Sequence, residues 1–136
     1  MTLLGGFAAT NWLATPNLTV NPTIIDAGGQ GRGLYATQTK LTLRDMTIQR
    51  GTAQDGGGIY LDRTVATLDN VTVVASAASR HGGGVYQAHG STTLRNVLFL
   101  SNAAANNGGG FAAYGGHFAV EQNSEFAYNQ AATNGG

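Results

Sequence analysis

The chain of 136 residues contains no cysteine and few charged residues. The lack of cysteine excludes a disulfide framework and thiol redox chemistry. Only 10% of the residues are charged, and seven basic residues balance seven acidic ones, so the formal net charge is zero. Because nucleic-acid-binding domains normally carry an excess of basic residues, the composition argues against a nucleic-acid partner.

Long apolar runs are missing as well. No stretch reaches the roughly 20 apolar residues that a transmembrane helix needs, so we expect no membrane insertion by this segment. The N-terminal stretch "MTLLGGFAATNWLA" has neither a basic start nor a long apolar core, and we identify no signal peptide in it. The length suits one domain with a core of modest size.

Glycine, by contrast, is abundant and periodic. Three triplets, in "DGGGIYL", "HGGGVYQ" and "NGGGFAA", begin at residues 56, 82 and 108, at a constant spacing of 26 residues. Glycine is costly to order, so a triplet that recurs at one spacing indicates a structural repeat. We expect each triplet to lie at a tight corner that needs unusual backbone dihedrals and has no room for a Cβ atom.

Apolar residues recur in phase with the triplets and alternate with polar ones, as in "TLDNVTV", which is a strand period. The aligned repeats show four apolar columns: Leu43, Leu68, Leu94 and Val120; Ile48, Val73, Phe99 and Phe126; Met46, Val71 and Val97, broken by Ser124; and Leu34, Ile59, Val85 and Phe111. Units this small cannot bury an apolar face alone, so they must stack. The pattern predicts an all-β fold, a parallel β-helix (solenoid) of about four to five coils with a repeat of 25–27 residues. An antiparallel sandwich would not require like residues to recur at one spacing.

We expect residues 1–136 to form a single β-helix domain with about three short strands in each repeat. Residues 1–32 are predicted to form an opening coil, followed by coils over residues 33–57, 58–83, 84–109 and 110–136. Because the chain starts and stops within the repeat pattern, we expect a fragment of a longer array. The alternative is end-to-end self-association, in which coils of neighbouring molecules stack into a filament.

Three further columns have structural interpretations. Asn and Asp tolerate the left-handed backbone of a bend, and their stacked side chains can form a ladder. Small side chains suit a tight turn of the wall, and neighbouring charges of alternating sign help to set the register. The columns are a turn ladder of Asp45, Asn70, Asn96 and Asn123; a small-residue column of Ala53, Ala78, Ala104 and Ala131; and a charged column of Arg44, Asp69, Arg95 and Glu121.

Two motifs carry a family resemblance. The triplets read "GGGI", "GGGV" and "GGGF", and "FLSN" (99–102) and "FAYN" (126–129) follow the F-x-x-N pattern. This pairing resembles the repeats of polymorphic outer-membrane proteins and related bacterial β-helix proteins of the pectin-lyase-like superfamily. The stretches "GGFAATNW" and "NPTIIDAGGQGRGLY" are similar to the first coils of large secreted β-helix proteins. "VVAS" (73–76) and "IQRG" (48–51) depart from the F-x-x-N pattern.

The resemblance implies a right-handed solenoid that belongs to a bacterial secreted or cell-surface protein. It implies a structural or adhesive role, with surface glycans or other molecules of a host or cell surface as partners. It names no ligand.

The pectin-lyase-like fold also occurs in polysaccharide lyases and glycoside hydrolases, so a polysaccharide-cleaving enzyme is the alternative hypothesis. A hydrolase needs two carboxylates on one face. A lyase would instead combine a basic residue with acidic calcium ligands. The nearest match to that combination is Arg44 beside Asp69. The candidate carboxylates are Asp45, Asp55, Asp62 and Asp69. Each has a structural interpretation in a turn, a loop or the charged column, so we assign no catalytic residue.

The remaining polar motifs indicate no cofactor. His81, His89 and His117 lack the spacing of a metal site. The stretch "GGQGRG" (28–33) is not followed by a helix, so it lacks the positive helix end that binds phosphate. We therefore expect no metal site and no bound cofactor.

One column of aromatic residues is the best candidate for a ligand site. Tyr35, Tyr60 and Tyr86 occupy equivalent outward positions, and Ala112 interrupts them in the next repeat. An exposed aromatic strip on a sheet can hold sugar rings, which makes these tyrosines the candidate glycan-binding residues. The alternative interpretation is that tyrosine simply suits the surface of a strand.

Overall fold

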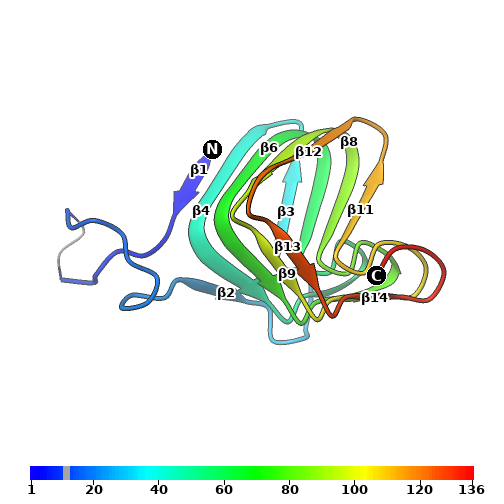
Figure 1. Ribbon diagram of the computed structural model, residues 1–136, viewed down its shortest axis with the longest axis horizontal. Helices are drawn as coiled ribbons and strands as arrows, with labels where there is room; N and C mark the ends of the chain where they lie inside the picture. Colours follow the sequence, from blue (N-terminus) through cyan, green and yellow to red (C-terminus); the bar gives the residue numbers. More distant parts are fainter. Residues whose placement is uncertain (11–12) are drawn as a thin grey trace.

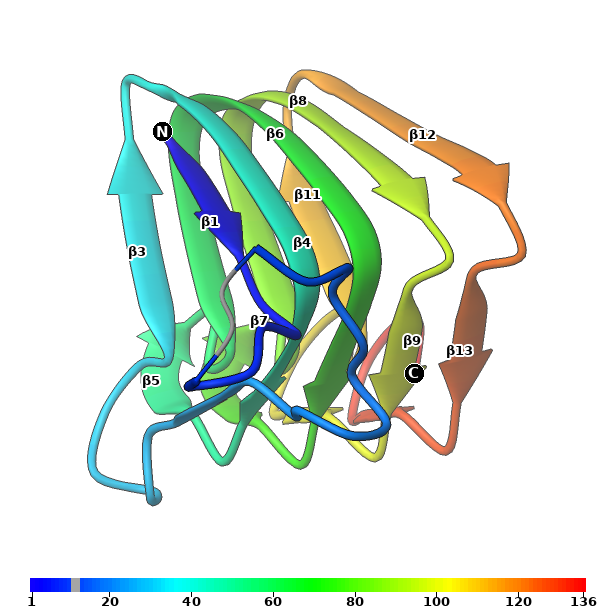
Figure 2. The same ribbon diagram turned by 90° about the vertical axis from the view of Figure 1, so that its left-hand side faces the viewer.

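The computed structural model describes residues 1–10 and 13–136, and all regular secondary structure in these residues is β-strand. Strands of successive repeats lie side by side and form the wall of a solenoid (Figure 1). Figure 2 shows the coils following one another through β4, β6, β8 and β12. Asn11 and Trp12, which end the motif "GGFAATNW", lie outside the described residues.

The strands are short except for three long ones, β4, β6 and β8. Their bounds are β1 (Thr2–Leu4), β2 (Ile24–Asp26), β3 (Leu34–Thr37), β4 (Lys40–Gln49), β5 (Thr52–Asp55), β6 (Ile59–Val74), β7 (Ala77–His81), β8 (Val85–Arg95), β9 (Leu98–Leu100), β10 (Ala103–Ala104), β11 (Phe111–Tyr114), β12 (His117–Gln122), β13 (Glu125–Ala127) and β14 (Gln130–Ala131).

The pairing of the strands confirms the predicted all-β parallel solenoid, with about four coils. A large sheet wraps around the molecule, and its central order is β1-β4-β6-β8-β11. A second sheet, in the order β14-β10-β7-β5, closes each coil. Every strand pairing within the described residues is parallel, because each strand pairs with the equivalent strand one repeat away.

The apolar columns of the sequence are in register across the coils and point inward. Leu43 pairs with Leu68, which in turn pairs with Leu94, and all three side chains are fully buried. Phe99 stacks on Phe126 with ring centroids 4.6 Å apart and an interplanar angle of 11°. The core is therefore a set of continuous apolar stacks along the coil axis.

The bends within the coils differ from the expected pattern of three short strands. β4 and β6 continue through their bends, where Asp45 and Asn70 have φ angles of 57° and 54°. Asn96 and Asn123 are also left-handed, with φ of 51° and 26°. The residues at equivalent bends share this conformation, and pairing between β4 and β6 resumes directly after the bend, from Met46 with Val71. Within this turn column Asn70 donates a side-chain hydrogen bond to Asp45 at 2.7 Å.

The glycine triplets meet two separate requirements. The first glycine of each triplet is left-handed: φ is 61° at Gly56, 65° at Gly82 and 64° at Gly108. The second glycine lies against the backbone of a neighbouring coil, and a Cβ atom on Gly83 would lie 2.2 Å from the carbonyl oxygen of Ala103. The corner therefore needs both an unusual φ angle and the absence of a side chain, as the sequence predicts.

The F-x-x-N motif forms a second, buried ladder. Its asparagine, Asn102, is fully buried and donates hydrogen bonds to the carbonyl of Val73 at 2.8 Å and to the side-chain oxygen of Asn129 at 3.0 Å. Asn102 also accepts a hydrogen bond from the backbone N–H of Ser76 at 3.0 Å. Asn129 repeats the pattern by donating to the carbonyl of Phe99 at 2.9 Å. The motif thus places its aromatic ring in the core and its amide on the backbone groups of a corner.

The charged column forms two ion pairs. Arg44 contacts Asp69 at 2.8 Å, and Arg95 contacts Glu121 at 2.6 Å. The register of β12 against β8 shifts between Val120 and Gln122, which accommodates the one extra residue of the last repeat in a bulge. The two ion pairs lie on the outer surface, where an exposed pair contributes at most about 1 kcal/mol to stability.

Candidate functional site

The predicted tyrosine column is present on the outer surface of the solenoid. Tyr35 pairs in register with Tyr60, and Tyr60 pairs with Tyr86. Both pairs of rings have centroids 5.3 Å apart, with interplanar angles of 28° and 46°. The rings point outward because the residues that flank Tyr60, Ile59 and Leu61, are fully buried on the opposite face of the strand.

Arg32 covers part of this column. Its guanidinium carbon lies 4.8 Å from the ring centroid of Tyr60 and 5.6 Å from that of Tyr35. The guanidinium is held there because it donates to the carbonyls of Asp55 at 2.8 Å and Gly56 at 3.0 Å. The rings of Tyr35 and Tyr60 thus cover part of each other, and the Arg32 guanidinium covers a further part. The guanidinium lies close enough to both rings for a cation–π interaction.

A polar column runs beside the tyrosines, at the position that directly precedes each glycine triplet and the final glycine pair. It consists of Asp55, His81, Asn107 and Asn134, which pair in register across the coils. Asn134 donates to the side-chain oxygen of Asn107 at 3.1 Å, and the amide nitrogen of Asn107 lies 3.3 Å from Nδ1 of His81. Asp55 accepts from the backbone N–H of His81 at 3.2 Å and from Arg80.

From the sequence we considered Asp55 as a candidate carboxylate and His81 as a candidate metal ligand, each by itself, and missed this column. The signal was available, because one polar residue stands before the glycines in "QDGGG", "RHGGG", "NNGGG" and "TNGG". The residue type changes from carboxylate to imidazole to amide over the first three positions, so the column does not show the identity that makes a repeat obvious.

Burial and the neighbouring charges alter the tyrosine phenols. Burial raises the pKa of Tyr60, and the carboxylates of Asp62 and Asp55 raise it further. Burial also raises the pKa of Tyr86, with Asp55 as the next cause. Both phenols therefore stay neutral at physiological pH and can donate or accept a hydrogen bond.

A small pocket lies where the tyrosine column is interrupted. Ala112 pairs in register with Tyr86 and occupies the position that a fourth tyrosine would take. The pocket has a volume of about 120 Å³ and is lined by His81, Tyr86, Asn107, Ala112, Ala113 and Tyr114. The polar column and the open end of the tyrosine column thus meet at one place.

The candidate carboxylates of a hydrolase are each held by a neighbour. The contacts are Asp45 with Asn70 (2.7 Å), Asp55 with Arg80, Asp62 with Thr37 (3.2 Å) and Asp69 with Arg44 (2.8 Å). Asp62 lies in β6, two residues after Tyr60 and on the same outer face of the strand, which we call the tyrosine face. The other three lie in the turn column, the polar column and the charged column. Each carboxylate has a structural partner in the place where it stands.

The histidines are separated in the fold. His81 belongs to the polar column, and its ring lies 6.1 Å from that of Tyr86. His89 contacts Tyr114 edge to face at 5.5 Å, and His117 begins β12. Among the described residues, no group of three or more histidine and acidic side chains could hold a metal ion.

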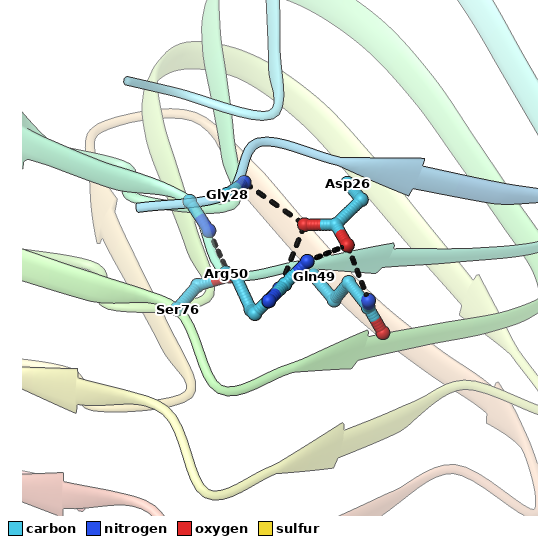
Figure 3. Close-up of polar contacts among 6 residues, drawn as sticks. Asp26, Gly28, Gln49, Arg50 and Ser76 are labelled. Atoms are coloured by element: carbon cyan, nitrogen blue, oxygen red, sulfur yellow. Dashed lines mark hydrogen bonds and ion pairs between the residues drawn. The ribbon is translucent and has the colours of Figure 1, made fainter. Parts of the chain in front are cut away.

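A cluster of polar contacts around Asp26 joins the opening segment to the next coil (Figure 3). Asp26, at the end of β2, accepts hydrogen bonds from Arg50, from Gln49 at 2.8 Å and from the backbone N–H of Gly28 at 2.9 Å. The bond from Arg50 is the main reason that the pKa of Asp26 lies well below its usual range. We interpret this cluster as a clamp between coils, because β2 pairs with β4 beside it.

Comparison with known proteins adds no relative. No family model, no curated protein and no solved structure matches this chain. Within the described residues, no helix has the length and apolar character needed to cross a membrane.

Proposed function

We propose that this chain is a structural or adhesive β-helix segment of a bacterial secreted or cell-surface protein, and that its tyrosine face contacts surface glycans without cleaving them. We further propose that it belongs among the pectin-lyase-like β-helix proteins with repeats like those of polymorphic outer-membrane proteins. The observation that carries the binding role is the outward-facing tyrosine column with the polar column beside it.

The roles of the repeat residues support the proposed family. The phenylalanine of F-x-x-N fills the core, its asparagine satisfies the backbone of a corner, and the glycine triplet allows close approach of the coils. These requirements explain why the motifs recur together. They also explain "VVAS", where the hydroxyl of Ser76 accepts a hydrogen bond from the N–H of Gly51 at 3.2 Å.

The chemistry of the tyrosine face supports glycan binding. A sugar ring offers partly positive C–H groups, which suit the negative face or edge of a phenol ring, together with hydroxyls that need hydrogen-bond partners. Neutral phenols, the amide of Asn107 and the imidazole of His81 supply such partners on a rigid wall. Because Tyr60 and Tyr86 lie in strands that pair with the coils on both sides, binding there loses little conformational entropy.

A glycan array tests this proposal. The labelled chain is compared with a variant in which Tyr35, Tyr60 and Tyr86 are all replaced by alanine, and with Tyr128→Ala as a control at an exposed tyrosine elsewhere on the surface. We expect binding to a subset of glycans, loss of binding in the triple variant, and no change in the control.

The same glycans are incubated with the chain and assayed for new reducing ends and for unsaturated products. Release of either would contradict the non-catalytic role and favour the polysaccharide-cleaving alternative. Equal binding by the native chain and the triple variant would contradict the assignment to the tyrosine face.

A further inference from the structure

The tyrosine column ends in an open space. Tyr60 lies between Tyr35 and Tyr86, with both ring centroids 5.3 Å away, and Arg32 covers part of it. A flat ligand therefore has little access to the faces of the first two rings. At Tyr86 the next residue of the column is Ala112, whose methyl group leaves the place of the fourth ring unfilled.

The pocket at this point has the size of one ring. Its volume of about 120 Å³ is well below the roughly 300–1,000 Å³ of sites for drug-sized ligands. Ala112 and Ala113 contribute only small side chains to the lining, and Tyr86 and Tyr114 contribute aromatic rings. Tyr114 is supported by His89, whose ring meets it edge to face.

The polar side of the pocket retains hydrogen-bonding capacity. The amide of Asn107 uses its oxygen to accept from Asn134 and its nitrogen to contact Nδ1 of His81. That amide nitrogen carries a second hydrogen, and the imidazole has a second nitrogen, Nε2. Within the described residues, neither has a hydrogen-bond partner. Because Nδ1 accepts from this amide, the imidazole hydrogen lies on Nε2, so two N–H donors border the aromatic wall.

From these observations we propose that the pocket binds a single neutral hexopyranose unit of a glycan, with one face of the sugar stacked on Tyr86 above Ala112. The amide of Asn107 and the imidazole of His81 bind its hydroxyl groups, and Tyr114 borders the far edge. A pyranose combines a C–H face for the phenol with hydroxyls for the amide and the imidazole, whereas a plain aromatic ring would leave both polar groups unpaired. This inference rests on the proposed function, because it names the subsite at which the glycan is held.

The decisive variant is Ala112→Tyr, which fills the pocket by continuing the existing stack. Its ring extends a column that already contains three tyrosines, so we expect the fold to be retained. Tyr86→Ala removes the stacking wall, and Tyr35→Ala removes the ring at the opposite end of the column, which separates the pocket from the rest of the column. Tyr128→Ala is the control at an exposed tyrosine outside the column. The probes are the methyl glycosides of glucose, galactose and N-acetylglucosamine, with phenol as an aromatic ring of similar size.

Binding is measured by titration with NMR detection of backbone amides, and far-ultraviolet circular dichroism checks the fold of each variant. We expect at least one glycoside to bind weakly and to shift the amides of Asn107 and Ala112. Ala112→Tyr and Tyr86→Ala should each weaken that binding about tenfold or more, which corresponds to about 1.4 kcal/mol. Tyr128→Ala should leave it unchanged, and Tyr35→Ala should weaken it less than Tyr86→Ala does.

The remaining outcomes separate the two proposals. If Ala112→Tyr binds like the native chain while Tyr35→Ala loses binding, the pocket is not the subsite, but the glycan role of the tyrosine face stands. Binding of phenol without binding of any glycoside overturns the sugar assignment. If the native chain binds glycans on the array but no methyl glycoside, the single-ring subsite is wrong. If it binds neither, both proposals fail.

Discussion

The side chain of Asn102 donates a hydrogen bond to the side-chain oxygen of Asn129, the equivalent residue one coil further along, at 3.0 Å. The oxygen of Asn129 also accepts from the backbone N–H of Asn102 at 3.0 Å. One amide thus satisfies both a side chain and a backbone group of its neighbour. The backbone N–H of Ser76 donates in the same way to the side-chain oxygen of Asn102. The buried ladder therefore connects successive corners of the solenoid.

Replacing Asn102 by alanine should be strongly destabilising. The change leaves the carbonyl of Val73 and the N–H of Ser76 without their partner in a fully buried corner. We expect a loss of about 2–4 kcal/mol in the free energy of unfolding, measured by urea denaturation. The control is Asn106→Ala, an exposed position on the same coil, for which we expect a change within about 0.5 kcal/mol. Equal effects at the two sites would contradict the role of the buried ladder.

Replacement by alanine should change the free energy of unfolding in opposite directions at two glycines, Gly83 and Gly31. Neither Gly83 nor Gly31 has a positive φ angle, so the added methyl group is decisive. A Cβ atom on Gly83 would collide with the carbonyls of Ala103 and Gly109, and we expect a loss of about 2–4 kcal/mol. A Cβ atom on Gly31 would meet nothing within 4 Å, and we expect a gain of up to about 1 kcal/mol from the less flexible unfolded chain. Thermal unfolding of the two alanine variants tests this difference. A Gly83→Ala variant as stable as the native chain would rule out close approach of the coils.

The carboxyl of Asp26 should titrate at unusually low pH. Because the hydrogen bond from Arg50 favours the ionised form, the folded-state pKa is lowered, and Gln49 adds to the effect. The stabilisation is therefore present at neutral pH and is lost as the pH falls below the usual range of a carboxyl group. NMR titration of the Asp26 side chain should show this, and Arg50→Gln should raise the midpoint. Lys40→Gln, which removes a charge elsewhere, should not. A native midpoint in the usual range would contradict the clamp.

Tyr60 and Tyr86 should ionise above the usual pKa of tyrosine, about 10. Burial is the main cause, and it disfavours the phenolate in the folded state. The fold should therefore keep this contribution to stability below about pH 10 and lose it as the pH rises through the raised pKa values. Ultraviolet titration of the native chain, compared with Tyr60→Phe and Tyr86→Phe, isolates the two phenols by difference. A difference curve with its midpoint at or below the usual value would contradict their burial.

The fold was predictable from sequence because its stabilising interactions repeat. Leu43, Leu68 and Leu94 share a column in the sequence and a stack in the structure, since parallel in-register pairing places equivalent residues next to each other. The length of the strands was predicted less well. A left-handed residue such as Asn70 suggests the end of a strand, and β8 does end before Asn96, but β6 continues through Asn70 because it pairs with β4 on both sides of the bend.

The candidate site was only partly predictable, because its key features interrupt the repeat. The tyrosine positions follow from the alignment, and so does the gap at Ala112. The amide and imidazole that border that gap are Asn107 and His81, which have little in common as residue types and pair only through an isolated bridge. The pocket forms between two columns, and the spacing along one repeat does not show which columns become neighbours across a corner.

The bulge at Glu121 has a consequence for how such a chain can evolve. One additional residue enters β12, yet Val120 before it still pairs with Leu94, and Phe126 after it still pairs with Phe99. An insertion is thus absorbed locally and does not propagate into the following columns. A repeat of this kind can therefore gain or lose a single codon at such a bulge while the order of the stacked residues is preserved.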